Sequence, residues 1–254
     1  MNASIIQQNN DAVHLLRRGY CNDASSALKC ALLRLQLSFR HTSSLESESV
    51  DLPSDAQDVP HIQRQAKGVR DTFSFKHTIM GPESSESPAP LVAISIEYEN
   101  KHQSDPSDAF LALYSRAFYL PLNETRERVL SSVILYNCAL ASHLSGVCRQ
   151  GDSQNLNNAR MLYKYAFRIL QEGNFEMDSI QLLWLALYNN LGHVSFQLFH
   201  LEEAGHYVKC LRAEMGLSDE DDLGATLPTI EDDDYDFFCF NVAVHVELMG
   251  APAA

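Results

Sequence analysis

Residues 188–211 read YNNLGHVSFQLFHLEEAGHYVKCL, and this stretch decides the fold that the sequence predicts. Apolar residues recur at helical spacing on both sides of a short break between Leu198 and Glu202, which predicts two helices joined by a turn. Gly192 and Ala204 lie on different predicted helices. Because small side chains let two helix backbones approach closely, we expect these two residues to face each other in an antiparallel helix hairpin.

The same arrangement of small residues recurs twice elsewhere in the chain. Ala12 and Ala24 have the spacing of Gly192 and Ala204, with Gly19 in the turn between them. Ala139 and Ala159 are further apart, which predicts an inserted loop over 147–155. Three such hairpins indicate a repeat architecture, in which each hairpin buries its apolar face against the next. The residues expected to pack the hairpins are Ala12, Ala24, Leu28, Ala31, Ala139, Ala159, Tyr163, Ala166, Leu191, Gly192 and Ala204.

These hairpins resemble the tetratricopeptide repeat (TPR), whose first helix carries an aromatic residue, Leu and Gly and whose second carries Ala. Tyr188, Leu191, Gly192 and Ala204 match those positions, and Val208 replaces the expected aromatic residue. The whole chain further resembles a group of diatom proteins with such repeats, a likeness that implies no particular activity. The resemblance implies a mostly α fold: an α-solenoid of about three imperfect TPR-like hairpins, with a concave groove that binds a peptide.

Each hairpin also carries an asparagine at the same place in its first predicted helix: Asn10, Asn137 and Asn190. In the TPR family this asparagine faces the concave groove or bonds along a backbone, so the resemblance implies a groove lined by these helices. The groove candidates inferred from repeat geometry are Asn9, Val13, Leu16 and Arg17, then Tyr136, Leu140 and His143, and then Asn189, His193, Phe196 and Gln197.

The segments outside the hairpins differ in composition. Six of the nine prolines fall between residues 41 and 108. The candidate strands are 73–80, 91–98 and 111–120. Residues 235–249 fit either a strand or a helix, and we expect a helix because a helical array needs an end cap. The expected division is a TPR-like hairpin (1–40), a flexible acidic linker (41–70), a small β insertion (71–121), two TPR-like hairpins (122–217), an acidic loop (218–234) and a C-terminal capping helix and tail (235–254).

The charge of the chain excludes some classes of partner. It has 33 acidic and 19 basic side chains, a net charge of −14, and the acidic excess is concentrated after Arg212, the last basic residue. Nucleic acids and anionic membranes require clustered Lys and Arg, so neither is an expected partner. Without a basic and apolar leader, and with six irregularly spaced cysteines, we expect an intracellular protein, cytoplasmic or nuclear and not secreted, with reduced thiols.

The sequence contains no recognisable catalytic motif. Four histidines, His143, His193, His200 and His206, invite a metal site, but no Cys or carboxylate completes a set at zinc spacing, so we expect groove or surface histidines. We therefore expect no enzyme, cofactor or metal, and a protein-interaction scaffold or adaptor that binds an apolar or basic segment. The alternatives are a structural assembly subunit, or an enzyme with a pocket of titratable residues whose pKa values are shifted.

Overall fold

The computed structural model describes residues 2–45, 91–96, 111–149, 152–173, 175, 177–217 and 230–250. Within these ranges the chain forms seven helices and one two-stranded sheet, so the expectation of a mostly helical protein is confirmed. One compact unit comprises residues 1–35 and 88–254, and the contacts described below lie within it.

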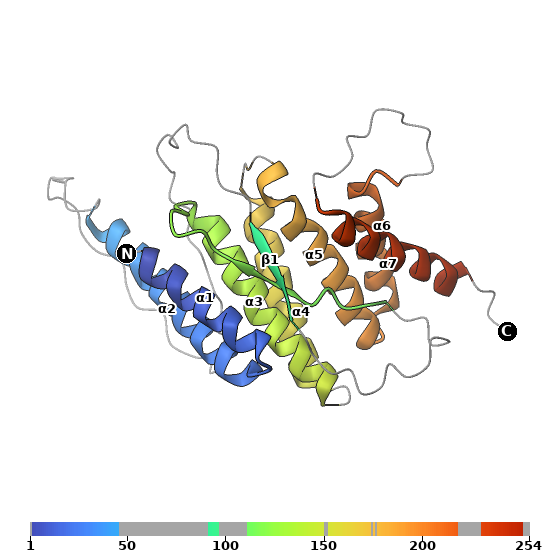
Figure 1. The fold of residues 1–254 in the computed structure, drawn as a ribbon, viewed down its shortest axis with the longest axis horizontal. Coiled ribbons are helices and arrows are strands. Elements are labelled where there is room, and N and C mark those ends of the chain that lie inside the picture. The colour runs from blue at the N-terminus through green and yellow to red at the C-terminus, as the bar shows by residue number, and fades with distance from the viewer. Residues whose placement is uncertain are drawn as a thin grey trace, which may run out of the picture. The chain divides into compact units, whose positions relative to one another are not determined.

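Figure 1 shows the helices in chain order, and from α3 onward each helix contacts the next. They are α1 (Asn2–Arg17), α2 (Cys21–Leu45), α3 (Glu127–Cys148), α4 (Ser153–Gln171), α5 (Met177–Gln197), α6 (Leu201–Glu214) and α7 (Asp232–Gly250). The helices α1, α3, α5 and α7 also contact one another in that order, and we call them the inner helices. The Arg34 guanidinium on α2 donates to the Ser4 hydroxyl on α1 at 3.3 Å, which ties the first pair together.

The helix ends follow the turn residues in part. Gly19 and Gly216 end α1 and α6 in the left-handed region, with φ of 79° and 69°, where glycine avoids the steric cost of a side chain. Asn22 and Asp23, residue types that often precede a helix, lie inside the first turn of α2, which begins at Cys21. Similarly, Asp178 lies inside α5, which begins at Met177.

The predicted loop over 147–155 is too long, because residues 147–148 belong to α3 and residues 153–155 to α4. The Asp152 carboxylate accepts hydrogen bonds from the backbone N–H groups of Gln154 and Asn155, at 3.1 and 3.3 Å. This cap starts α4 at Ser153, while α3 continues to Cys148. The extra residues of this hairpin therefore lengthen its two helices.

The predicted start of the linker, at residue 41, is also too early, because α2 runs to Leu45. Residues 46–70, where the sequence predicts a flexible acidic linker, lie outside the described residues. The strand expected over 73–80 lies outside them as well.

The two other candidate strands pair with each other, but over a shorter length than expected. Strand β1 (Val92–Ser95) runs antiparallel to β2 (Arg116–Tyr119), with Val92 opposite Tyr119 and Ser95 opposite Arg116. Residues 111–115 precede β2 without belonging to a strand. Their backbone groups are instead bonded by side chains of the inner helices, as described below.

The C-terminal segment forms a helix, as expected: α7 spans Asp232–Gly250. The acidic loop predicted over 218–234 is wrong at its end, because Asp232, Asp233 and Asp234 form the first turn of α7. Carboxylates are stabilised there by the positive end of the helix dipole. Residues 218–229 lie outside the described part of the chain.

Small residues bring the helices of a pair close together, as at Gly192. A Cβ atom built on Gly192 would lie 3.3 Å from the Val208 Cγ2 atom and 3.8 Å from the Ala204 carbonyl oxygen. All eleven residues named from the sequence as packing residues are buried. Among the described residues, α3 is the one helix long and apolar enough to cross a membrane, but 89% of its apolar window is buried inside the protein, so core packing accounts for its hydropathy.

Candidate peptide-binding site

An extended stretch of the chain, residues 111–120, lies against the inner helices, and we call it the clamped segment. It contains β2, and its contacts reach α1, α3, α5 and α7 (Figure 1). Tyr114 and Phe118 are 2% and 0% exposed, so this segment is part of the core.

Four asparagines hold the backbone of the clamped segment, one from each inner helix. In every case the side-chain Oδ1 atom accepts the N–H of one residue, and the Nδ2 group donates to the C=O of the same residue. We call these four residues the asparagine ladder. The pairs are Asn10 with Leu120, Asn137 with Phe118, Asn190 with Tyr114 and Asn241 with Ala112, at N···O distances of 2.8 to 3.1 Å.

The ladder occupies one edge of the clamped segment and β1 occupies the other. In an extended chain, alternate residues direct their N–H and C=O groups to the same edge. The ladder binds even-numbered residues, whereas Ser115 accepts a hydrogen bond from the Ile96 N–H at 2.8 Å on the β1 side. Because the ladder bonds only backbone atoms, these contacts do not depend on which side chains the clamped segment carries.

Two further asparagines connect neighbouring rungs of the ladder. Asn9 donates to the Phe118 carbonyl at 3.2 Å, and its own Oδ1 atom accepts from Asn137 at 2.9 Å. The second half of the site repeats this arrangement with Asn189, Ala112 and Asn241. Each half of the site therefore consists of an Asn-Asn doublet on one inner helix and a single Asn on the next.

Tyrosine hydroxyls fill the gap between the two halves. Tyr136 is fully buried, donates to the Arg116 carbonyl at 3.2 Å and packs edge-on against the Phe118 ring, with centroids 5.0 Å apart. The Tyr163 hydroxyl accepts from Asn190 at 3.2 Å. Burial raises the pKa of both tyrosines above its usual value, so both hydroxyls stay protonated.

One carboxylate, that of Asp234 in the first turn of α7, accepts hydrogen bonds from side chains of the clamped segment. It accepts from the Tyr114 hydroxyl at 3.1 Å and from the Arg116 guanidinium at 3.2 Å, and only 2% of its side chain is exposed. Burial raises the pKa of Asp234, and the positive charge of Arg116 opposes that rise. Burial and the neighbouring Asp234 charge raise the pKa of Tyr114.

Three of the groove candidates from the sequence, Asn9, Tyr136 and Asn189, touch the clamped segment. The apolar candidates Val13, Leu16 and Leu140 are 0% exposed, so they present no free surface. Arg17 and Gln197 are exposed, and Phe196 is half-buried.

Sequence reasoning missed the roles of Asn241 and Asp234. Asn241 had a signal, because it is an Asn among apolar residues on an inner helix, as in the three hairpins. For Asp234 the sequence offered only an acidic run, which resembles any solvated loop.

The two remaining candidates, His143 and His193, form a buried pair. Their Nε2 and Nδ1 atoms are 2.9 Å apart, so the N–H group of one ring donates a hydrogen bond to the other ring. Burial lowers the pKa of His193 to about 4 and, together with His193, lowers that of His143 well below its usual value. The described ranges contain no group of three His, Cys, Asp or Glu side chains that could hold a metal ion.

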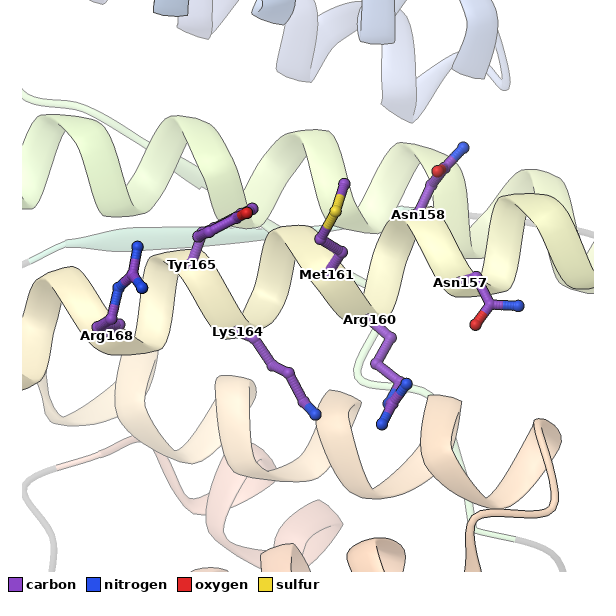
Figure 2. Close-up of a pocket in the computed structure, with 7 residues that line it drawn as sticks. All are labelled: Asn157, Asn158, Arg160, Met161, Lys164, Tyr165 and Arg168. Carbon is purple, nitrogen blue, oxygen red and sulfur yellow. The ribbon is translucent and has the colours of Figure 1, made fainter. Parts of the chain in front are cut away.

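A second surface feature lies on α4. Figure 2 shows Arg160 and Lys164 on one side of the helix, with Met161 and Tyr165 on the other. Arg160 and Lys164 both form ion pairs with Glu203, so much of their charge is already neutralised. This face is therefore a weaker candidate for ligand binding than the asparagine ladder.

No protein-family model matches this chain, and comparisons with curated proteins and with solved structures gave no match either. A functional conclusion consequently rests on the geometry of the ladder.

Proposed function

We propose that this protein is an interaction scaffold, an α-solenoid of three TPR-like helix hairpins capped by α7, which binds an extended polypeptide along its inner helices. The asparagine ladder is the observation that carries the proposal. Four side-chain amides form eight hydrogen bonds with the backbone N–H and C=O groups of even-numbered residues. An exposed sheet edge binds an added strand through the same kind of backbone bonds.

The clamped segment, in this proposal, is a ligand that the chain supplies to itself. It reads LALYSRAFYL, with one cation and no acidic residue, which matches the apolar or basic character expected of a partner. A tethered segment competes at an effective concentration of about millimolar or more. A partner therefore binds only when the clamped segment leaves at least part of the ladder.

The proposed role is binding and not catalysis. An enzyme needs titratable groups that a substrate can reach, with pKa values shifted by their environment. Tyr136, Tyr163 and His143, whose pKa values are strongly shifted by burial, are 0% exposed. The half-buried Tyr188 and Tyr207 have pKa values raised to about 12 by burial, so both stay protonated at neutral pH.

A second candidate function, a structural assembly subunit, is favoured by the depth at which the clamped segment lies. Phe118 and Leu120 are 0% and 2% exposed, and only six residues separate Leu120 from the start of α3 at Glu127. If the segment never leaves, the ladder is part of the core and partners bind elsewhere.

Hydrogen exchange distinguishes the two roles. We expect the amides of Ala112, Tyr114, Phe118 and Leu120 to exchange by a local opening that needs less free energy than global unfolding. A fluorescent peptide with the sequence of 111–120 should then bind the full chain saturably. The local opening of these amides should become easier in Asn190→Ala but not in Asn157→Ala, a matched substitution of an exposed asparagine on α4. Exchange of all four amides only through global unfolding, together with no peptide binding, would establish the structural role instead.

A further inference from the structure

We infer that the first turn of α7 selects the sequence of the strand that the asparagine ladder holds, through Asp234. The class of ligand it fits is an extended segment with Tyr, Arg and Phe at alternate positions, Tyr-x-Arg-x-Phe. This inference rests on the proposed function, because it concerns the same site.

Asp234 is a buried charge whose partners both come from the bound strand. Its Oδ1 atom accepts from the Tyr114 hydroxyl, and its Oδ2 atom accepts from Arg116 Nη1. The side chain of Glu231, one turn earlier, lies 3.8 Å from the same guanidinium but is 82% exposed. Water can solvate Glu231, whereas Asp234 at 2% exposure depends on what the strand supplies.

A strand without these two groups would leave the Asp234 carboxylate buried and uncompensated. A strand with a carboxylate in place of Arg116 would add repulsion, because Asp232 and Asp233 lie in the same turn of α7. The site therefore rejects acidic segments by electrostatics, while the ladder accepts any backbone.

Aromatic contacts fix the positions on either side of the cation. The Tyr114 ring stacks on Phe238, with centroids 4.9 Å apart, and meets Phe237 edge-on at 5.5 Å. Phe118 packs on Tyr136. Because both Tyr114 and Phe118 are also residues whose backbone the ladder clamps, their side chains enter these contacts only in one register of the strand.

The test uses the full chain and fluorescent peptides with the sequence of 111–120, either natural or with the change Arg116→Glu. We expect the natural peptide to bind at least about tenfold more tightly, since hydrogen bonds to charged groups contribute that much. In the isosteric variant Asp234→Asn, the preference should fall below about threefold. Asp236→Asn, which removes an exposed charge in the same helix, is the matched control and should leave the preference unchanged.

A second measurement does not require exchange of the clamped segment. In the full chain, Arg116→Glu should speed amide exchange at Ala112 and Tyr114 by about tenfold or more, and by much less when combined with Asp234→Asn. Equal binding of the two peptides to the wild type, or an equal effect of Arg116→Glu in both backgrounds, would overturn the role of Asp234. If no peptide binds but the exchange coupling is present, Asp234 selects the chain's own segment, and it is the proposed function that fails.

Discussion

Replacing the buried ladder residue Asn137 by alanine should lower the free energy of unfolding by roughly 2–6 kcal/mol. Asn137 is 0% exposed, and its Oδ1 atom accepts the Phe118 N–H at 3.0 Å. Its Nδ2 group donates to the Phe118 carbonyl at 2.8 Å and to Asn9 Oδ1 at 2.9 Å. After the substitution the carbonyl keeps its bond from Asn9, at 3.2 Å, but the Phe118 N–H and the Asn9 oxygen lose theirs. Each buried polar group left without a partner costs about 1–3 kcal/mol, and the two together give the expected range.

Urea unfolding of the full chain, followed by circular dichroism, measures this loss. The control is Asn157→Ala, whose side chain is exposed and donates to the Ser153 carbonyl at 2.7 Å. Solvent replaces such a bond, so the control should stay within about 0.5 kcal/mol of the wild type. Asn137→Ala and Asn157→Ala with equal stabilities would show that the ladder does not hold the clamped segment.

Two further predictions concern the helix contacts and the histidine pair. Gly192→Leu should destabilise the protein by about 1–3 kcal/mol or more and lower its melting temperature, because even a Cβ atom there would lie 3.3 Å from Val208. The control Ala213→Leu, at an exposed position, should not lower the melting temperature comparably. The folded pKa of His193, about 4, is below its unfolded value, so the unfolded chain binds more protons and stability falls with pH below about 6.5. Between pH 7 and pH 5 we expect the free energy of unfolding to fall by about 2 kcal/mol because of His193, and further because of His143. The variant His193→Gln should lack the His193 contribution. The same pH dependence in the wild type and the variant would contradict this.

Local patterns in the sequence were enough to predict most helices. The periodicity of apolar residues and the turn signals at Gly19 and Gly216 depend on neighbours within about one helical turn, and the structure has helices at each of these places. The spacing of Ala139 and Ala159 shows that residues were added, but spacing alone does not decide whether they form a loop or extend the helices. The Asp152 cap decides it here, and the helices are extended.

The candidate site was harder to predict because its contacts are distant in sequence. The three hairpin asparagines stood out because they recur at one position, yet the strand they hold is 19 to 110 residues away along the chain. Residues 111–120 looked like an ordinary strand candidate. Asp234 differs from Asp232 and Asp233 only through its contacts with Tyr114 and Arg116, which no local pattern reveals.

The alternation of doublets and single asparagines follows from helix geometry. Successive residues of a helix are turned by about 100°, so the two members of a doublet cannot face the same rung. On α1, Asn10 bonds to the backbone of Leu120, while Asn9 points towards α3 and accepts from Asn137. On α5, Asn190 bonds to the backbone of Tyr114, while Asn189 accepts from Asn241 on α7. Each pair of inner helices thus holds two residues that are two apart in the strand.

This geometry also fixes the register of any strand that the ladder holds. A shift by one residue would turn the clamped N–H and C=O groups to the opposite edge and break all eight ladder bonds. A shift by two keeps the ladder but moves the cation at position 116 away from Asp234 and the aromatic ring at 114 away from Phe238. The backbone contacts therefore exclude odd shifts, the α7 contacts exclude even ones, and the two kinds of contact specify a single register only when they act together.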